Sequence, residues 1–406
     1  MGDSTLVGDL YIVGGGDPTI GSTSDCAQKL SETFSAWAAI IRSAGINRID
    51  GRIIGDPRFF RGVPYCTSWQ ADDLGWYYGA GPTGLSFFEN TQTFYVTPGA
   101  SEGVAPFVRP HYPDTPWMHF NVSAVTTDPG TSNELSYVNS SFVPEGDFTG
   151  TFPVDRKGYT FEGTNRFGAY TCAYYFHNYL KKNGIVVTKG YGDVAPAGYI
   201  RTDLSSAAKG SAAPSQNLLC VIGSTSSPRL ADIASDTNHQ SDNFYAETLL
   251  HTLGAIMRGD SQYSACSDAA SEALSSMGLD ATSINWCDGS GLSRHNFISP
   301  EFFVRFLKAM ARSSVFPEYF ASLPQPGGDG TLKNRMKSAP DATKERIHMK
   351  SGSMDGVRCF SGYITSRDGN PDHTIVFSVL TNNVTASSYT VYGILDDIIL
   401  GLAAEN

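Results

Sequence analysis

The chain has 406 residues, of which 29 are Lys or Arg and 40 are Asp or Glu, so its formal net charge is −11. With 41% hydrophobic residues it can bury a large core, which excludes intrinsic disorder and collagen-like repetition. The acidic balance argues against nucleic-acid binding, because phosphate backbones require a concentrated basic surface. No apolar run approaches the roughly 18–20 residues of a membrane span. We therefore expect an acidic globular protein of two or three domains.

An amphipathic helix is predicted over residues 25–44, with Asp25 as its cap and Gly45 at its end. Its apolar positions recur at helical spacing: Leu30, Phe34, Trp37, Ile41 and Ala44. Before it, the run Gly14–Pro18 follows an apolar strand-like segment. Pro18 favours a tight structural turn there over a dinucleotide-binding loop.

A strand pattern follows at residues 46–54, and residues 55–160 are dense in Gly, Pro, Thr, Ser and aromatic residues. Short alternating segments that end in turn residues predict a β-rich region there. A second helix is predicted over residues 165–182, followed by a strand at 185–188. The Ser- and Ala-rich stretch 204–217 is the best candidate for a linker.

The part of the chain beyond this stretch alternates between helical and strand-like patterns. Helices are predicted at residues 241–257, 264–277 and 300–312, and strands at 357–364 and 374–381. The last helix carries one apolar face, formed by Val391, Ile394, Leu395, Ile398, Ile399 and Leu402. Strands bracketed by helices indicate a sheet with helices packed on it.

The cysteines and histidines indicate neither a disulfide framework nor a metal site. Seven cysteines are scattered singly without any CxxC, which favours free thiols; one bridge such as Cys266–Cys287 is the alternative. The eight histidines show no HExxH or HxxxH spacing, so no zinc site on one helix face is expected. No GxSxG elbow or GxxxxGK[ST] phosphate loop occurs either.

Two short segments carry residue types that are typical of acyl-transfer chemistry. Ser241-Asp242-Asn243 directly precedes a predicted helix, and Lys350-Ser351-Gly352-Ser353 precedes a predicted strand. Each also has a structural explanation. Ser, Asp and Asn are preferred helix N-caps, and Lys-Ser-Gly can form a polar turn leading into a strand.

Together these segments resemble two of the three motifs of penicillin-recognising serine acyltransferases, SxxK, S-x-N and K-[ST]-G. Longer runs are similar to the D-alanyl-D-alanine carboxypeptidase/endopeptidase family, the class C low-molecular-weight penicillin-binding proteins. In chain order these runs are 8–19, 45–56, 73–90, 241–254, 288–294, 323–335 and 348–363. The resemblance therefore extends over nearly the whole chain.

The resemblance implies a role for each motif residue. Ser241 would relay a proton to the leaving amine, and Asn243 would hold the substrate backbone. Lys350 would supply positive potential and a hydrogen bond to Ser241. Ser351 would bind the terminal carboxylate of the substrate, and Gly352 would let the substrate lie against the strand. The backbone N–H of Ser353 would form half of an oxyanion hole.

The nucleophile motif SxxK is the element that departs from the family pattern. The family places it before the run that begins at Gly8, whereas the single match here is Ser206-Ala207-Ala208-Lys209, within the predicted linker. Ser206 is thus a weak candidate, and the nucleophile is unknown. Three interpretations stay open: a truncated form or misassigned reading frame, which we prefer; a silent homologue; or a different nucleophile, including one from another chain. The start Met1-Gly2, without a signal peptide, favours the first.

The predicted fold is α/β. A serine β-lactamase/transpeptidase-like core spans residues 215–406 and lacks its N-terminal segment, and a β-rich inserted region spans 1–214. The resemblance implies a penicillin-binding serine carboxypeptidase in the periplasm or cell envelope. Its substrate would be peptidoglycan stem peptides and its inhibitors β-lactams, and it would need no metal or cofactor. One alternative is a silent peptidoglycan-binding homologue. A β-lactamase is another, although the large inserted region argues against it.

Overall fold

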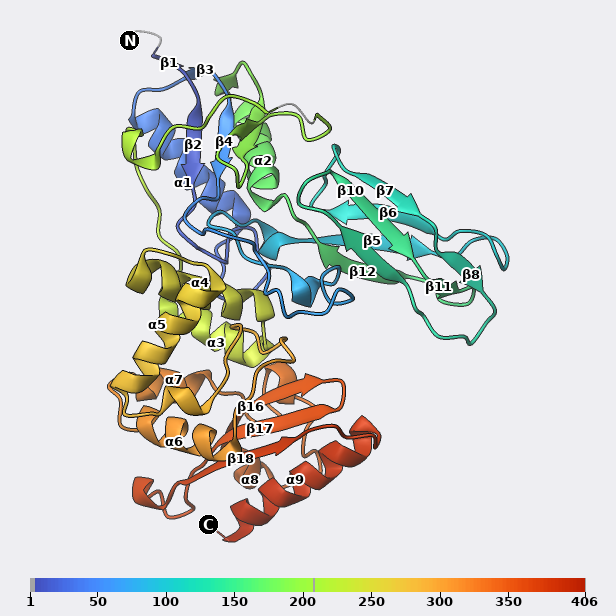
Figure 1. The fold of residues 1–406 in the computed structure, drawn as a ribbon, viewed down its shortest axis with the longest axis vertical. Helices are drawn as coiled ribbons and strands as arrows, with labels where there is room; N and C mark the ends of the chain where they lie inside the picture. Colours follow the sequence, from blue (N-terminus) through green and yellow to red (C-terminus); the bar gives the residue numbers. More distant parts are fainter. Residues whose placement is uncertain (1–3, 207–208, 406) are drawn as a thin grey trace. The chain divides into compact units, whose positions relative to one another are not determined.

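The computed structural model of the chain describes residues 4–206 and 209–405, and Figure 1 shows its fold. The chain divides into two compact units. Unit 1 comprises Met1–Pro228 and Glu247–Gln262, and unit 2 comprises Arg229–Ala246 and Tyr263–Asn406. The boundary at residue 228 leaves the Ser- and Ala-rich stretch within unit 1. There the Ile200 N–H donates to the Ser211 carbonyl oxygen (2.9 Å), and the Ala213 N–H donates to that of Gly198 (2.9 Å).

The first part of unit 1 is an α/β layer of two small sheets and two long helices. The sheet β15-β14-β4-β2 has three parallel strands and an antiparallel edge, and the strands of β1-β3-β13 are all parallel. The helices bury aromatic side chains such as Phe34 and Phe176 against Ile49 and Ile53. The bounds are β1 (Thr5–Val7), β2 (Leu10–Val13), α1 (Leu30–Ser43), β3 (Arg48–Asp50), β4 (Ile53–Asp56), α2 (Gly168–Lys182), β13 (Val186–Val187), β14 (Tyr191–Val194) and β15 (Ile200–Arg201).

Two boundary predictions in this layer are wrong. Helix α1 begins at Leu30 with Lys29 at its N-cap position, so Asp25 does not cap it. The strand expected over residues 46–54 is split into β3 and β4. A side chain at Gly51 would place its Cβ 1.9 Å from the Gly8 carbonyl oxygen, so the chain bends there around a close backbone approach. The structural turn predicted after β2 is confirmed, since the chain bends at Gly16 (φ 84°) and turns from Pro18 onward.

The middle of unit 1 is β-rich, as predicted. It contains the sheets β12-β5-β6 and β7-β10-β9 and the pair β11-β8 (Figure 1). The sheets enclose a core dominated by aromatic side chains, including Phe94, Tyr137, Phe148 and Phe161. The bounds are β5 (Thr91–Thr97), β6 (Phe107–Tyr112), β7 (His119–Val122), β8 (Val125–Thr127), β9 (Ser136–Asn139), β10 (Glu145–Thr149), β11 (Thr151–Pro153) and β12 (Tyr159–Thr164).

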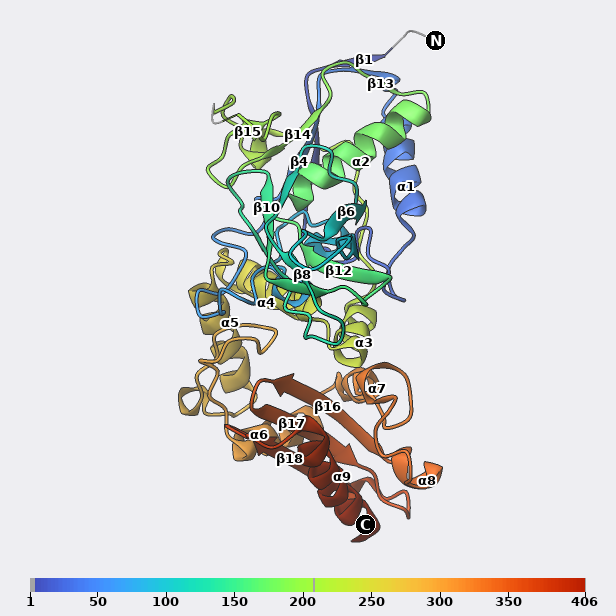
Figure 2. The same ribbon diagram turned by 90° about the vertical axis from the view of Figure 1, so that its right-hand side faces the viewer.

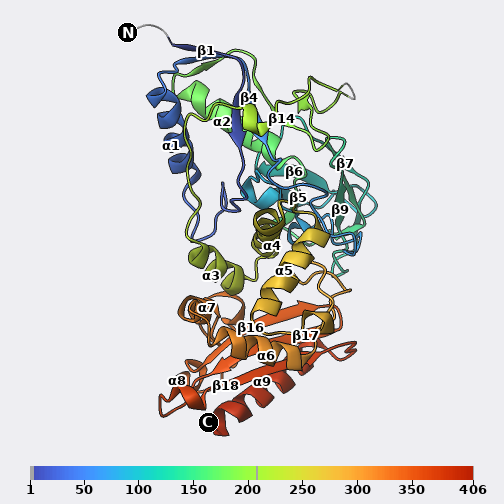
Figure 3. The ribbon, with the colours of Figure 1, turned by 60° about the vertical axis from the view of Figure 1, so that its left-hand side comes forward.

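Unit 2 contains an antiparallel sheet, β16-β17-β18, between helical layers, which Figures 2 and 3 show from two sides. On one face Phe360 packs with Leu395 and Ile399 of α9. On the other face Tyr363 packs with Leu307 of α6 and with aromatic residues of α7. The bounds are α3 (Leu230–Gln240), α4 (Asn243–Arg258), α5 (Tyr263–Ser276), α6 (Pro300–Met310), α7 (Phe316–Ser322), α8 (Asp341–Lys344), β16 (Ile347–Met354), β17 (Val357–Ile364), β18 (Ile375–Thr381) and α9 (Ser388–Glu405); α4 continues into unit 1.

The helices predicted at residues 241–257, 264–277 and 300–312 are confirmed as α4, α5 and α6, with bounds that agree to within two residues. The buried face of α9 is narrower than predicted. Its buried residues recur every four positions, at Val391, Leu395, Ile399 and Ala403. Ile394 and Ile398, predicted to be part of the apolar face, are 56% and 44% exposed. The sheet lies along a single stripe of the helix, so residues one position before that stripe face outward.

Candidate active site

Ser241 lies in the two-residue connection between α3 and α4. Helix α3 ends at Gln240, and Ser241 takes the left-handed conformation (φ 56°, ψ 48°), which is uncommon for residues other than glycine. Asn243 then begins α4 and is half-buried. The sharp reversal at Ser241 places its hydroxyl at a junction of two helices, where both flanking segments are ordered by helical hydrogen bonds.

The helix-cap interpretation of this segment holds for Asp242. Its Oδ1 accepts a hydrogen bond from the Tyr245 backbone N–H (2.8 Å), which is the N-cap bond of α4. Burial raises the pKa of the Asp242 carboxyl. The middle residue therefore stabilises the helix start, which leaves Ser241 and Asn243 on either side of it for other roles.

Replacing Asp242 by alanine is expected to lower the free energy of unfolding by about 1 kcal/mol, because backbone donors of Phe244 and Tyr245 in the first turn of α4 lose their acceptor. Urea denaturation would measure the change. Asp242→Asn keeps a capping oxygen, so we expect it to retain most of the stability. Equal stability of Asp242→Ala and the parent protein would contradict the capping role.

Lys350 reaches Ser241 from the edge strand β16, which is 109 residues away in the sequence. Ile347 and Met349 point into the core on the α9 side, so the alternation of the strand turns Lys350 to the opposite face. Its Nζ donates to the Ser241 Oγ and to the Ser351 carbonyl oxygen, each at 2.7 Å. Burial lowers the pKa of Lys350 to about 8. The two motifs predicted to meet do so in unit 2, and Lys350-Ser351-Gly352 lies within a strand rather than in a polar turn.

The outer edge of β16 presents backbone amides away from β17. The Met349 N–H donates to the Pro324 carbonyl oxygen (3.0 Å) outside the sheet. Because hydrogen-bonding directions alternate along an antiparallel strand, the N–H of Ser353, four residues on, faces the same side. Ser353 is exposed. This is the direction that an oxyanion-hole donor on this strand requires.

Gly352 and Ser351 of β16 have few close neighbours within the protein. A Cβ at Gly352 would meet only the Cys359 Cβ at 3.6 Å, an ordinary contact, so packing within the protein does not require glycine here. The Ser351 hydroxyl lies 3.3 Å from that of Thr331. A methyl group therefore fits beside Gly352, on the same face as Lys350.

His348 is a neighbour of the site that lies outside the three-residue motifs. It lies two residues before Lys350 and thus on the same face of β16. Its ring stacks near Phe320 (centroids 4.0 Å apart), and its Nε2 lies 3.0 Å from the Gln325 Nε2. Burial lowers the pKa of the His348 imidazole. The two-residue period of β16 identifies it once the strand is known, but the sequence pattern did not predict that strand.

The segment 288–294 forms a compact loop around Asp288, which is fully buried. Its carboxylate accepts from the backbone N–H groups of Gly291 (3.0 Å) and Ser293 (2.6 Å) and from the Asn296 amide (2.8 Å). The loop ends at Arg294, whose guanidinium lies 3.6 Å from the Asp355 carboxylate in the β16–β17 turn. This exposed ion pair connects the segment to the hairpin that carries Lys350 but contributes little to its stability.

Ser206, the weak nucleophile candidate, follows a turn after β15 in unit 1. Its backbone N–H lies 3.4 Å from the Asp203 carbonyl oxygen, and its side chain is exposed. Ala207 and Ala208 of the same SxxK match lie outside the described residues. Ser206 itself is not part of a helix, whereas the pairing of Ser and Lys three residues apart relies on helical spacing.

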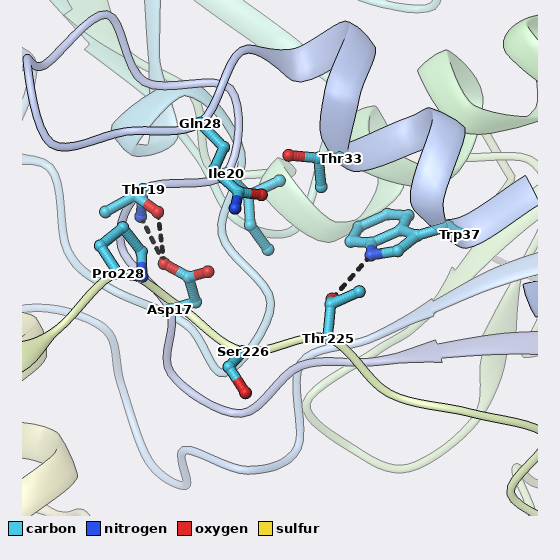
Figure 4. A pocket seen from close by; sticks show the side chains of 9 residues that line it. All are labelled: Asp17, Thr19, Ile20, Gln28, Thr33, Trp37, Thr225, Ser226 and Pro228. Atoms are coloured by element: carbon cyan, nitrogen blue, oxygen red, sulfur yellow. Dashed lines mark hydrogen bonds between the residues drawn. The ribbon is translucent and has the colours of Figure 1, made fainter. Parts of the chain in front are cut away.

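A polar hollow in unit 1 lies where α1 meets the segments around residues 17–20 and 225–228 (Figure 4). The Thr19 N–H and Oγ1 both donate to the Asp17 Oδ1, at 2.8 and 2.7 Å. The Trp37 Nε1 donates to the Thr225 Oγ1 (2.9 Å). These bonds stabilise the turn and fasten the 225–228 segment to α1, so the hollow has a structural explanation.

Three further findings concern metals, thiols and membranes. Within residues 4–206 and 209–405, no group of three or more His, Cys, Asp or Glu side chains could hold a metal ion. No disulfide joins the seven cysteines within the described residues, Cys266 and Cys287 included, which agrees with their scattered spacing. In the same described ranges, every helix is too short or too polar to span a bilayer.

Comparison with known proteins identifies the family. The sequence model of the D-Ala-D-Ala carboxypeptidase 3 (S13) family matches residues 1–393. The chain belongs to this family. The family resemblance read from the motifs is thereby confirmed.

Curated relatives of this S13 chain are longer than it is. It is 28% identical over 398 residues to a D-alanyl-D-alanine carboxypeptidase of Actinomadura sp. (strain R39), covering 93% of this chain and 66% of the relative. It is 26% identical over 349 residues to the penicillin-sensitive carboxypeptidase A of Dictyostelium discoideum, covering 82% and 62%. The chain thus spans less than two thirds of the length of each.

Among solved structures, the S13 chain is similar to penicillin-binding protein 4 (dacB) of Haemophilus influenzae. The TM-score is 0.74 at 19% identity, and the match covers 94% of this chain and 77% of the other. At this identity the likeness shows the fold. The predicted α/β class, a transpeptidase-like core with an inserted region, is confirmed.

Proposed function

We propose that the chain acts as a penicillin-binding serine D-Ala-D-Ala carboxypeptidase/endopeptidase on peptidoglycan stem peptides. The observation that carries this proposal is the 2.7 Å hydrogen bond from the Lys350 Nζ to the Ser241 Oγ. It joins the two family motifs in one site and gives the serine hydroxyl a cationic neighbour. Family membership supports the reaction class.

The reaction is acyl transfer through a serine ester. A serine Oγ, which we leave unassigned, attacks the carbonyl carbon of the penultimate D-Ala. The C–N bond to the terminal D-Ala then breaks, and the proton lost by the nucleophile reaches the leaving amine through the Ser241 hydroxyl. Water hydrolyses the ester, which releases the shortened peptide and regenerates the serine. Lys350 stabilises the negative charge that passes through the relay.

The strand β16 would hold the substrate while this occurs. Ser351 and Lys350 bind the terminal carboxylate, and Asn243 holds the substrate backbone. Gly352 leaves the open space that the peptide occupies, and the Ser353 N–H donates to the oxyanion. A β-lactam presents a carboxylate and a reactive amide in a similar arrangement, so it would acylate the same serine. The proposed substrate implies a location in the periplasm or cell envelope, where peptidoglycan lies.

Two measurements on the 406-residue chain test the proposal. The first is non-covalent binding of diacetyl-L-Lys-D-Ala-D-Ala, followed by chemical-shift changes of β16 amides. The second is labelling with a fluorescent penicillin, with mass spectrometry to locate the adduct and an assay for released D-Ala. The same chain extended by any residues that the gene encodes upstream serves as the comparison.

The outcomes separate the interpretations. An adduct identifies the nucleophile directly, and an adduct on Ser206 would assign it to the 202–209 segment. An adduct that appears only on an extended chain would place the nucleophile upstream. Peptide binding without an adduct on either chain would favour a silent peptidoglycan-binding homologue. If neither ligand binds either chain, the proposal is wrong.

A further inference from the structure

The sheet β12-β5-β6 of unit 1 has one face that its own core does not use. Phe94 and Val96 of β5 and Phe161 of β12 point inward and are at most 1% exposed. The alternating positions point outward, because successive side chains of a strand face opposite sides. The outward residues of β5 and β6 include two large exposed rings, Phe107 at 65% and Tyr95 at 37% exposure.

A β-bulge arranges the rings on this face. The pairing register of β5 with β6 shifts between Thr93 and Phe94, so His111 is an extra residue on the edge strand. Bulges redirect side chains, and this one brings the His111 ring to 4.3 Å from that of Tyr95, centroid to centroid. The Tyr95 hydroxyl and the His111 Nε2 lie 3.0 Å apart. The Arg109 guanidinium lies 5.2 Å from the Tyr95 ring centroid.

Hydroxyl groups border these rings. Thr160 of β12 lies directly opposite Tyr95, and Thr97 lies opposite Phe107. Both threonines are exposed, and their hydroxyls have no hydrogen-bond partner within residues 4–206 and 209–405. The face also carries one guanidinium, Arg109, and one carboxylate, Glu162, so its charges nearly balance. We call the surface formed by Tyr95, Phe107, Arg109, His111, Thr97 and Thr160 the outer platform.

We propose that the outer platform binds a β-1,4-linked glycan strand of N-acetylated amino sugars. Sugar rings present C–H groups on their faces and hydroxyl or acetamido groups at their edges. The platform has matching parts, since Phe107 and Tyr95 offer ring surface and Thr97 and Thr160 offer free hydroxyls. Phe107 and Tyr95 are diagonal neighbours across two strands, roughly 7–8 Å apart, so both can contact one extended chain.

The chemistry of the platform favours this occupant over a protein. Aromatic residues and Arg occur in protein interfaces as well, but threonine is under-represented among the residues that carry the binding energy there, and Thr97 and Thr160 border these rings. The near balance of charge suits an uncharged polymer better than a polyanion. The choice of this glycan rests on the proposed function, because stem peptides are carried by such strands.

The test uses the full chain and a ligand that contains no peptide, the N-acetylglucosamine hexamer, with calorimetry as the measurement. We expect saturable binding by the parent protein. Phe107→Ala and Tyr95→Ala are each expected to weaken it at least tenfold, and Tyr95→Phe less. The matched control is Phe142→Ala, since Phe142 is 90% exposed in the same β-rich region but off the platform. Circular dichroism and thermal melting verify that each variant is folded.

Several results would overturn the inference. The first is that the parent protein does not bind the hexamer. The second is that Phe107→Ala and Tyr95→Ala bind it as tightly as the parent protein does. The third is that Phe142→Ala weakens binding as much as the platform variants do. If sedimentation shows that the parent protein is a dimer and that Phe107→Ala is a monomer, the platform is a self-association surface instead. Binding of diacetyl-L-Lys-D-Ala-D-Ala is measured in parallel. Loss of glycan binding with intact peptide binding refutes only the platform. Glycan binding by a chain that binds neither the peptide nor penicillin counts against only the proposed function.

Discussion

The free energy of unfolding is expected to rise by about 3 kcal/mol as the pH increases from about 8 to 10.5, and Lys350→Met should abolish this rise. The pKa of Lys350 is lowered by burial from 10.5 to about 8 in the folded protein. Between these values the unfolded chain binds a proton that the folded chain has released, so stability increases with pH. At about 1.4 kcal/mol per pKa unit, the difference amounts to about 3 kcal/mol.

Urea denaturation at several pH values, compared between the parent protein and Lys350→Met, measures this effect. The comparison is needed because buried tyrosine and cysteine side chains such as Cys172, whose pKa burial raises, destabilise the folded state at high pH. These contributions are common to both proteins and cancel. The matched control is Lys333→Met, an exposed lysine in the same unit. If the free energy of unfolding changes with pH in the same way for the parent protein and Lys350→Met, the lowered pKa of Lys350 in the folded protein is refuted.

The same lysine predicts the pH dependence of ligand binding. A charged hydrogen bond to a carboxylate contributes about 1.5–3 kcal/mol, so Lys350→Met is expected to weaken binding of a D-Ala-D-Ala peptide at least tenfold. In the parent protein, affinity should fall as the pH rises through about 8 rather than through the ordinary lysine range. Affinity that is constant from pH 7 to 9 would argue against Lys350 as the carboxylate partner.

Alanine at two glycines of the β16–β17 hairpin is expected to give opposite results. A Cβ at Gly362 would lie 2.0 Å from the His348 carbonyl oxygen and 2.6 Å from the Met349 Cα, both backbone atoms of β16. Gly362→Ala must push the two strands apart, so we expect a loss of about 3 kcal/mol or more in the free energy of unfolding. Thermal or urea unfolding measures it.

Gly352→Ala is the matched variant on the neighbouring strand. Its Cβ would meet only the Cys359 Cβ, at 3.6 Å, so stability should change by less than about 0.5 kcal/mol. The new methyl group would instead stand on the Lys350 face, where we propose that substrate lies, and peptide binding should weaken. A destabilised Gly352→Ala variant, or one that binds the peptide normally, would contradict the assignment of that space to substrate.

Local patterns predicted many elements of this protein, for a physical reason. Helices α4, α5 and α6 are marked by apolar residues at helical spacing, and Asp242 and Ser299 cap α4 and α6 from within a few positions of the chain. The strand β17 was predicted with its observed bounds, Val357–Ile364, since its apolar run is bounded by turn residues. Helix α3 was missed because it carries few apolar residues, and Ile233 is its one buried residue.

The candidate site was predictable in composition but not in geometry. Ser241, Asn243 and Lys350 were identified by motif, and the structure brings Ser241 and Lys350 together. The left-handed backbone of Ser241 was not predictable, because a serine carries no local signal for that conformation. Nor was the neighbouring His348, which joins the site through the alternation of a strand that the sequence pattern did not reveal.

By itself the sequence determined the family, the α/β class and the residue types of the site, because motifs and short-range periodicity are local properties of the chain. The tertiary structure decided which faces those residues use. Ile394 and Ile398 of α9 point outward although their spacing is helical, and Lys350 is desolvated enough to lower its pKa. Both outcomes depend on neighbours that are distant in the chain, since burial and charge are set by packing and not by the order of residues.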